Sequence, residues 1–307
     1  MTTDTVINAA SLANAFRAAN ALTRKHSRTF YFATRLLPVA TRSAIRALYL
    51  FCRSTDDLVD LQQATPADVA AWRAQVALPA ALQPDARLSA WAHVREQYGV
   101  NSRFEHELID GVALDLTQRR YQTWADLEHY CYLVASTVGL LSLPIIGLAP
   151  GVAEADAATY AIRMGIALQL TNILRDVGED AARGHIYIPQ ADLHAFNLTS
   201  QDIFDGVHDA RFVALMQFEI ARARQIYRAA LPGIALLAPA ARVAVGAAAV
   251  LYAAILERIE ATDYRVHTER ARTTDFEKLL RLPGIFAYVQ RLRHPDNSAR
   301  LRPPIKF

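Results

Sequence analysis

The chain has 307 residues, of which 52% are hydrophobic and 21% charged, and this composition excludes a disordered protein and favours one with a large apolar core. The net charge of +3 is too small to indicate a nucleic-acid partner, and no nucleic-acid motif accompanies it. The two cysteines, Cys52 and Cys131, have neither metal-ligand nor disulfide spacing, which indicates free thiols and a cytoplasmic protein.

Predicted helices follow one another along the chain, separated by short runs that contain glycine and proline. Start signals support two of them: Pro66 follows Thr65, and Asp126 stands three residues after Thr123. RGHIYIP, 183–189, is the one clear extended piece. No repeat or linker divides the chain, so we predict a single all-α domain over 1–307, with its core at about 26–292 and a short basic tail. The helices are expected at 11–25, 41–62, 66–77, 86–98, 103–120, 124–146, 154–182, 208–231, 240–262 and 275–292.

Two apolar stretches, 134–153 and 229–256, are about as long as a membrane span requires. Prolines and glycines interrupt both, and Arg242 lies within the second. The N-terminus lacks the basic start and the continuous apolar run of a signal peptide. We therefore expect both stretches to lie in the interior of the protein.

The sequence FCRSTDDLVD, 51–60, ends an apolar helix with charged side chains. Tyr49, Arg53, Asp56 and Asp60 are spaced by four, three and four residues, so at roughly 100° per residue they fall within about 60° on one helix face. A phenol, a guanidinium and two carboxylates therefore follow one another along that face.

The sequence LQLTNILRDVGED, 168–180, repeats this arrangement. Gln169, Asn172, Asp176 and Asp180 share a face about 80° wide with Gly165. An apolar strip lies beside that face and consists of Ile166, Leu170, Ile173 and Val177. This helix is expected to present carboxylates on one face and core residues on the adjacent face.

A solvated surface explains most acidic helix faces, but it explains these two poorly. Solvated faces usually alternate Glu with Lys, whereas these use Asp at four-residue spacing, which is destabilising without a cation. Carboxylate and amide oxygens are ligands of Mg²⁺, which binds one or two carboxylates together with phosphate oxygens. We predict that the two helix ends hold Mg²⁺ against a diphosphate. The surrounding helices, rich in Ala, Leu, Ile and Val, would form a long apolar cavity for a hydrocarbon chain.

Four ordered motifs resemble the squalene/phytoene synthase family, and most closely its bacterial phytoene synthases. They are KHSRTFYFATRLLP, AIRALYLFCRSTDDLVD, YCYLVASTVGLLSLPIIG and GIALQLTNILRDVGEDAARGHIYIPQADL, and the resemblance extends from about His26 to Lys278. It implies an isoprenoid-synthase helical bundle with a central apolar cavity. It also implies Mg²⁺-dependent head-to-head condensation of two geranylgeranyl diphosphates to phytoene, through a cyclopropylcarbinyl intermediate, prephytoene diphosphate, and without NADPH. Whether Mn²⁺ can replace Mg²⁺ stays open.

The resemblance also implies roles for individual residues. Mg²⁺ ligation falls on the oxygen-bearing side chains of both helix ends, Asp56, Asp60, Asn172, Asp176 and Asp180. Diphosphate contacts fall on His26, Ser27, Arg28, Arg53, Gln169, Arg175, Arg270 and Lys278. Four tyrosines, Tyr49, Tyr132, Tyr187 and Tyr252, match positions near the reacting carbons, where an aromatic face can stabilise a carbocation.

Several of these assignments have competing explanations. Arg270 and Lys278 could instead form surface ion pairs with Glu269 or Glu277, and Tyr252 could serve only in helix packing. Among the tyrosines, Tyr187 follows an Arg-Gly turn and is the one expected to be catalytic.

Other positions near these motifs stand outside the predicted site. Asp110 and Asp115 are five residues apart, which does not align them on one helix face, so they are left out of the metal set. His185 stands where phytoene synthases usually have Arg, which removes the basis for a phosphate contact there.

Two other functions remain open from the sequence. A synthase of the same fold could use farnesyl diphosphate and make diapophytoene, presqualene diphosphate or, with NADPH, squalene. A non-catalytic assembly factor would be expected to lose acidic residues that this chain retains. We also expect peripheral association with the inner face of the membrane, assisted by the basic tail from Arg291 to Lys306, and the oligomeric state stays open.

Overall fold

The computed structural model describes residues 9–62 and 64–292, apart from the side chains of residues 9, 10 and 60–62. Helices dominate these ranges, and no strand occurs in them beyond two isolated bridges, Arg120 with Ile186 and Leu148 with Leu237. The prediction of an all-α protein is confirmed. Within the predicted extended piece RGHIYIP, Ile186 forms one of these bridges, whereas Arg183 and Gly184 form a turn.

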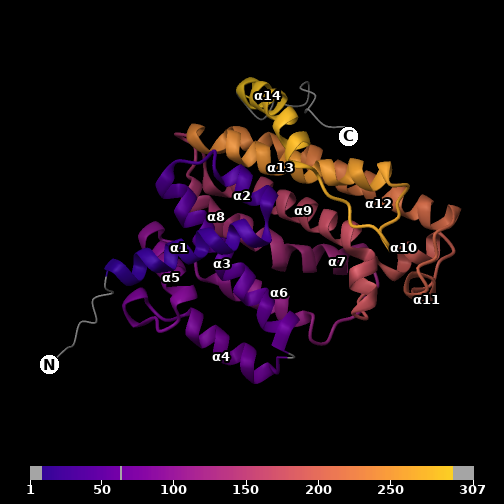
Figure 1. Ribbon diagram of the computed structural model, residues 1–307, viewed down its shortest axis with the longest axis horizontal. Coiled ribbons are helices and arrows are strands. Elements are labelled where there is room, and N and C mark those ends of the chain that lie inside the picture. The colour runs from indigo at the N-terminus through magenta and orange to yellow at the C-terminus, as the bar shows by residue number, and fades with distance from the viewer. Residues whose placement is uncertain (1–8, 63, 293–307) are drawn as a thin grey trace.

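The helices of the described ranges are arranged in sequence as shown in Figure 1. They are α1 (Ala9–His26), α2 (Arg28–Thr34), α3 (Val39–Gln62), α4 (Pro66–Val76), η1 (Ala80–Leu82), α5 (Ala86–Tyr98), α6 (Arg103–Leu114), α7 (Trp124–Cys131), η2 (Tyr132–Ser136), α8 (Thr137–Ile146), α9 (Glu154–Ala182), α10 (Gln190–Ala195), α11 (Ser200–Phe204), α12 (Ala210–Ala230), η3 (Leu231–Leu236), α13 (Pro239–Ala261) and α14 (Asp275–Arg291).

Each helix predicted from the sequence has a counterpart, and both predicted start signals are present. Thr65 and Thr123 form capping boxes with Asp68 and Asp126. Most ends agree within two residues, but the helix predicted over 103–120 already ends at Leu114. The helix predicted over 124–146 contains the π-helical turn η2. The short α2, α10 and α11 were missed because five to seven residues do not establish a helical period.

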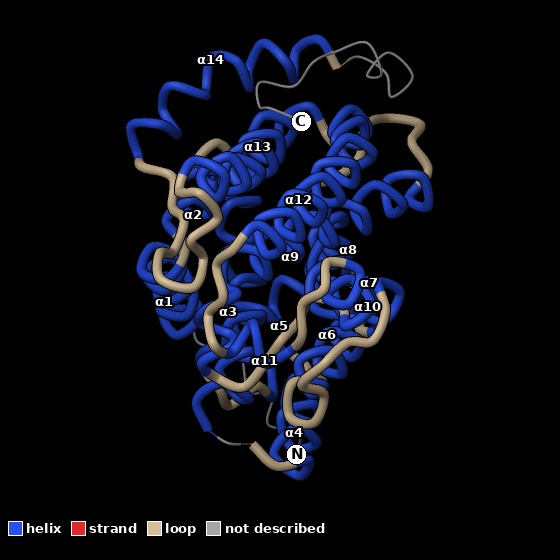
Figure 2. The backbone as a smooth tube through the Cα atoms, turned by 90° about the vertical axis from the view of Figure 1, so that its right-hand side faces the viewer, coloured by secondary structure: helices blue, strands red, loops and turns tan. Residues whose placement is uncertain are grey.

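Helix α9 runs through the middle of the bundle and packs against α7, α8, α12, α13 and η2 (Figures 1 and 2). Its predicted apolar strip is buried, with Leu170 only 1% exposed and Ile173 only 3% exposed. Gly165 lets α9 approach η2 closely, because a Cβ atom there would lie 2.5 Å from the backbone of Ser136. The buried strip therefore fixes which face of α9 remains for polar side chains.

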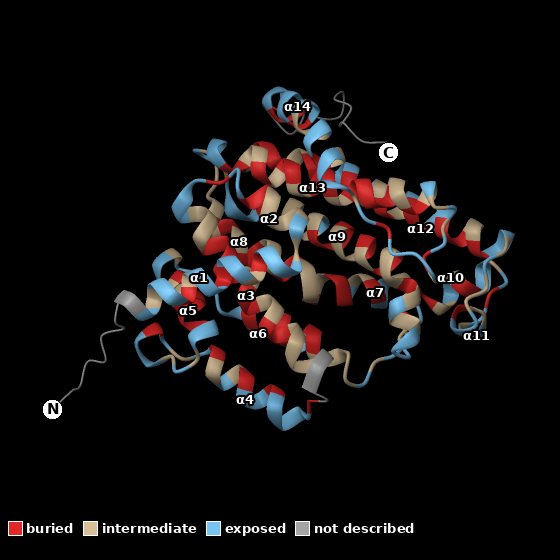
Figure 3. Ribbon diagram, viewed as in Figure 1, coloured by how far each residue is buried: buried red, intermediate tan, exposed pale blue. Residues whose placement is uncertain are grey.

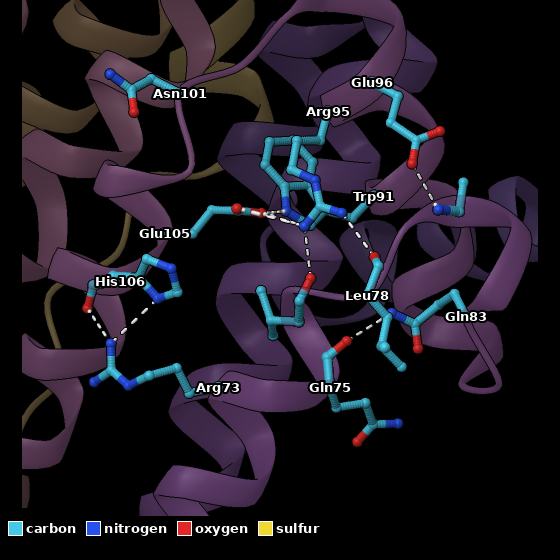
Figure 4. Close-up of polar contacts among 12 residues, drawn as sticks. Arg73, Gln75, Leu78, Gln83, Trp91, Arg95, Glu96, Asn101, Glu105 and His106 are labelled. Carbon is cyan, nitrogen blue, oxygen red and sulfur yellow. Dashed lines mark hydrogen bonds and ion pairs between the residues drawn. The ribbon is translucent and has the colours of Figure 1, made fainter.

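A second core surrounds α3 and is closed by a buried polar network between α4, α5 and α6 (Figure 4). Glu105 is 1% exposed, accepts a 2.6 Å hydrogen bond from Trp91 and lies 3.5 Å from the Arg95 guanidinium. Arg95 also donates to the carbonyl oxygens of Val76 and Leu78, at 2.6 and 2.7 Å. Since every group finds a partner, this network joins the three helices without leaving a charge unpaired.

Within residues 9–62 and 64–292, two helical stretches are long and apolar enough to cross a membrane, namely α13 and the continuous run 124–146 of α7, η2 and α8. Both supply side chains to the core, where Leu141 and Leu251 are fully buried. Figure 3 shows the burial of α13 along most of its length. This agrees with the interior position that we predicted for the apolar stretches 134–153 and 229–256.

The connection between α13 and α14, residues 262–274, crosses the C-terminal part of α9 as a strap. The Gly178 amide donates to the Val266 carbonyl at 3.3 Å, and the His267 ring packs on Phe212 with 4.8 Å between ring centroids. A Cβ atom on Gly178 would lie 2.6 Å from the Cα atom of His267. Close contact between two backbones therefore holds the strap against α9.

We expect Gly178→Ala to lower the free energy of unfolding by about 1–3 kcal/mol, because the added methyl group must displace the strap backbone. Chemical denaturation measures this loss. Gly246→Ala is a matched control, since the nearest neighbour of its Cβ would be a side-chain methyl, Val289 Cγ2 at 2.7 Å, which can shift at lower cost than backbone. Equal losses in the two variants would contradict a strap fixed by backbone contact.

Candidate active site

A polar cavity of about 500 Å³ lies between the C-terminal halves of α3 and α9. Its lining includes most residues of the two predicted acidic faces and additional side chains from α1, α6, α7 and the strap. The chemically functional residues that line it are His26, Tyr49, Arg53, Asp56, Asp115, Tyr130, Gln169, Asn172, Arg175, Asp176, Glu179, Asp180, Arg183, Tyr187 and Arg270. The structure therefore brings the two acidic helix ends together, as the sequence predicted.

An apolar cavity of about 340 Å³ adjoins the polar one. The two cavities share four lining residues, Tyr49, Val134, Gln169 and Asn172. Beyond them, small and aliphatic side chains from α2, α3, α8, α9 and α13 form its walls. A molecule with a strongly polar end and a long hydrocarbon chain matches this pair of cavities.

Carboxylates and arginines face each other across the polar cavity. Its described lining holds five carboxylates and four arginines. Arg175 binds Asp176 in a two-pronged contact, with hydrogen bonds of 2.8 and 2.5 Å. Arg270, carried by the strap, also contacts Asp176 at 3.0 Å and reaches Glu179 at 3.3 Å. Arg53 forms an ion pair with Asp57.

Asp180 is the carboxylate that the site stabilises least. Burial, followed by the nearby charge of Asp176, raises its pKa to about 7, although Arg183 acts in the opposite direction. The Oδ1 atom of Asn172 is also buried and has no hydrogen-bond partner among the described residues. A crowded carboxyl group and an unpartnered amide oxygen in one cavity fit a divalent cation with oxygen ligands.

The described side chains are not arranged as a completed metal centre. No three His, Cys, Asp or Glu groups among them converge closely enough to hold a metal ion. Arg175 and Arg270 both contact Asp176, so a cation that binds this carboxylate would compete with two guanidinium groups.

A cluster of tyrosines around Asp115 forms one wall of the polar cavity. Asp115 accepts hydrogen bonds from the hydroxyls of Tyr130 and Tyr187, at 2.9 and 3.0 Å. The rings of Tyr130 and Tyr187 stack with 5.2 Å between centroids, and Tyr121 stacks on Tyr187 at 5.7 Å. Burial raises the pKa of Tyr187 above its usual range, so its hydroxyl stays protonated and the ring stays in place.

The remaining predicted residues fall into three groups. Tyr252 and Ser27 line the apolar cavity, and Tyr49 stacks on Phe30 at 5.3 Å where the cavities meet. The side chain of Asp60 lies outside the described residues. Three residues line neither cavity, and they are Arg28, Tyr132 and Lys278.

Local packing accounts for two of these positions. Tyr132 begins η2 and donates a 2.7 Å hydrogen bond to Glu107 on α6. Lys278 is 3% exposed and forms an ion pair with Asp275 at 3.0 Å. Arg270 forms its ion pair with Asp176 in the cavity. These partners differ from Glu269 and Glu277, which the sequence offered as alternatives.

Asp115 and Tyr130 are cavity residues that the sequence reasoning missed. Asp115 was set aside because five-residue spacing does not align it with Asp110 on a helix. In the structure α6 ends at Leu114, so Asp115 caps the helix at the cavity, whereas Asp110 is exposed and paired with Arg73 at 2.5 Å. The end of α6 at Leu114, which the sequence did not indicate, is what brings Asp115 to the cavity. His185 contacts Arg119 and lines neither cavity.

Comparison with known proteins agrees with this geometry. The model of the squalene/phytoene synthase family matches residues 23–277. The chain is 42% identical over 286 residues to the 15-cis-phytoene synthase of Synechococcus elongatus, which covers 89% of this chain and 93% of that protein. It is 43% identical over 293 residues to the 15-cis-phytoene synthase of Synechocystis sp., covering 92% and 87% of the two chains.

Solved structures show the same fold. A dehydrosqualene synthase in complex with ligand matches with a TM-score of 0.83 at 27% identity, covering 91% of this chain and 98% of that chain. A squalene synthase from Alicyclobacillus acidocaldarius matches with a TM-score of 0.74 at 26% identity, covering 84% and 97%. The family match extends over most of the chain, and the matched residues include the two acidic helix ends that line the polar cavity. The chain belongs to the squalene/phytoene synthase family of prenyltransferases.

Proposed function

We propose that this protein is a phytoene synthase, which joins two molecules of geranylgeranyl diphosphate head to head and releases diphosphate. The observation that carries the proposal is the junction of a polar and an apolar cavity at Tyr49, Val134, Gln169 and Asn172. Identities above 40% to two 15-cis-phytoene synthases support geranylgeranyl diphosphate as the substrate.

The chemistry removes two diphosphates and two protons from two substrates. In the first half, the C1–O bond of one substrate breaks, its C1 atom bonds to the double bond of the other substrate, and a proton is lost as the cyclopropane of prephytoene diphosphate closes. In the second half, the remaining diphosphate leaves, the ring rearranges to join the two C1 atoms, and loss of a second proton gives phytoene. Because no electrons enter, NADPH is not required.

The residues of the polar cavity serve the departure of diphosphate. Arg53, Arg175 and Arg270 bind its oxygens, since a planar guanidinium can donate two parallel hydrogen bonds. Asp56, Asp176, Asp180 and Asn172, together with Asp60, would hold Mg²⁺, with Mn²⁺ as an alternative. The cation, when bound, stabilises the negative charge of the leaving group.

The residues at the cavity junction protect the carbocation. Tyr49 and Tyr252 bring aromatic rings to the apolar side, where attraction between a cation and an aromatic face is worth about 2 kcal/mol without water. Burial raises the pKa of Tyr49 to about 12, so its hydroxyl stays neutral at physiological pH. Stacking of Tyr187 on Tyr130 keeps a further ring at the polar wall.

A product assay tests the proposal directly. The purified protein receives geranylgeranyl or farnesyl diphosphate with Mg²⁺ in detergent micelles, with and without NADPH, and the extracted product is identified by mass. We expect phytoene from geranylgeranyl diphosphate in both conditions. Efficient turnover of farnesyl diphosphate alone would place the chain among the diapophytoene, presqualene diphosphate or squalene synthases, and no turnover of either substrate would favour a non-catalytic role.

Removing one carboxylate should abolish the reaction without unfolding the protein. We expect Asp176→Asn or Asp56→Asn to reduce the rate by at least about 100-fold, because stabilisation of the leaving group is lost. Circular dichroism should remain helical. Asp110→Asn is the matched control, since Asp110 is exposed and lies outside the cavity. Full activity in both cavity variants would contradict the metal assignment.

The pKa of Asp180, about 7 in the folded protein against an ordinary 3.8, makes stability depend on pH. A raised carboxyl pKa means that the folded state binds this proton more tightly than the unfolded state. The stabilising contribution is therefore complete below about pH 4 and is lost as the pH rises to about 7. Without divalent metal, Asp180→Asn should be more stable than the parent protein at pH 8, by about 1–3 kcal/mol.

Denaturation midpoints of the parent protein and of Asp180→Asn are measured between pH 4 and 8 in the presence of a chelator. The effect appears as a difference between the two proteins in the slope of the midpoint against pH. Asp110→Asn should keep the slope of the parent protein. If Asp180→Asn also kept this slope, burial and the neighbouring carboxylates would not raise the pKa of Asp180.

A further inference from the structure

Helix α14 is apolar on two opposite sides. Its inner side packs on α13, where Ile285 is fully buried and Val289 is 4% exposed. Its outer side carries four large apolar residues that face solvent, Phe276 at 69%, Leu280 at 63%, Leu279 at 58% and Phe286 at 54% exposure. Isolated exposed side chains of this kind are ordinary, but four on one helix form a surface for binding a partner.

The outer residues of α14 form a continuous stripe. At roughly 100° per residue, Phe286, Leu279, Phe276 and Leu280 fall within about 120°. Pro283, Ala287 and the uncharged Gln290 lie between them. The two carboxylates of the helix, Asp275 and Glu277, lie outside this sector. The stripe therefore contains no negative charge. A helix with this pattern can lie flat in the interfacial region of a bilayer.

The stripe lies close to the cavities. The side of α13 opposite α14 lines the apolar cavity through Ala244, Ala248 and Tyr252, so one helix separates the cavity from α14. Helix α2 packs on the same apolar cluster as α14, through Ala33. At the N-terminus of α14, Lys278 donates a 3.0 Å hydrogen bond to Asp275. This hydrogen bond and the charge of Lys278, with a smaller contribution from the charge of Arg28, lower the pKa of Asp275.

The segment that contains α1, α2 and most of α3 is strongly basic. Residues 5–55 include eight Lys and Arg residues and no Asp or Glu, although the whole chain has 30 acidic residues and a net charge of only +3. Five of these basic residues, Arg17, Arg24, Lys25, Arg28 and Arg35, are exposed. Arg28 and Arg35 lie at the two ends of α2, which packs with α14 on one apolar cluster, and Arg24 and Lys25 lie in the last turn of α1, directly before α2. An uncharged apolar stripe together with these basic residues is complementary to a bilayer with anionic headgroups.

We propose that the outer stripe of α14 inserts into the interfacial region of an anionic phospholipid bilayer, with the exposed basic residues of α1 and α2 on the headgroups. This inference rests on the proposed function, because it explains why docking would be useful. The substrate and the product would both be lipids that partition into the same bilayer. A second copy of the chain fits the stripe less well, because a symmetric contact there would bring two basic surfaces together.

Vesicle co-sedimentation of the full chain tests this proposal. The vesicles consist of phosphatidylcholine with or without phosphatidylglycerol. We expect binding to the anionic vesicles, and a loss of affinity of about tenfold or more in Phe276→Ser/Leu280→Ser/Phe286→Ser. Leu82→Ser is the matched control, since Leu82 is 62% exposed on η1, on the side of the molecule away from α14, and should bind like the parent protein (Figure 1).

A second pair of residues tests the electrostatic part. Arg24→Gln/Lys25→Gln should bind anionic vesicles several-fold more weakly at low salt and show less weakening as salt is added. Thermal melting confirms that each variant is folded. The proposal is overturned if the triple variant binds as tightly as the parent protein. It is also overturned if light scattering shows a dimer that the triple variant abolishes while vesicles bind neither protein.

Activity in detergent micelles separates this proposal from the proposed function. The triple variant should form phytoene in micelles at the rate of the parent protein and lose activity only when the substrate is supplied in vesicles. Equal loss in micelles and vesicles would count against docking as the role of the stripe. Absence of product from both proteins in micelles would count against the proposed function and leave the vesicle-binding result standing.

Discussion

The crowding of carboxylates on one face of α9 is the constraint on which the rest of the structure depends. Asp176 and Asp180 are one helical turn apart and share their cavity with Asp115, Glu179 and Asp56. Like charges at this spacing destabilise a helix, and partial burial makes the cost larger. The arginines on Asp176 relieve one carboxylate, and the raised pKa of Asp180 is the part of the cost that they leave.

Packing around α9 holds this face in position. The adjacent apolar strip lies in the core, and two glycines bring the backbone of α9 into contact with other backbone segments, Gly165 against η2 and Gly178 against the strap. The same strap carries Arg270 to Asp176. The packing of α9 therefore sets both the position of the carboxylates and the position of a guanidinium that faces them.

Much of this arrangement could be predicted from the sequence, and the reasons differ from feature to feature. Helical spacing was sufficient to place Asn172, Asp176 and Asp180 on one face, because a long helix keeps its period whatever it packs against. Spacing could not place Asp115, which depends on where α6 ends, nor Tyr132, whose direction is set by the π-helical turn that it begins. The contact of Arg270 with Asp176 joins residues 94 positions apart, so only the folded strap determines it.

Apolar surface continues from the cavity to the outside of the molecule. Helix α13 is apolar toward the cavity and toward α14, and α14 is apolar toward α13 and toward solvent. An interior helix such as α13 is expected to be apolar on both sides. The outer side of α14, however, exposes apolar surface to water, and no other part of the fold covers it among the described residues. For an enzyme whose substrate carries a long hydrocarbon chain and whose product is a hydrocarbon, a bilayer would remove that cost. It would also bring the lipid phase close to the wall of the cavity in which the chains react.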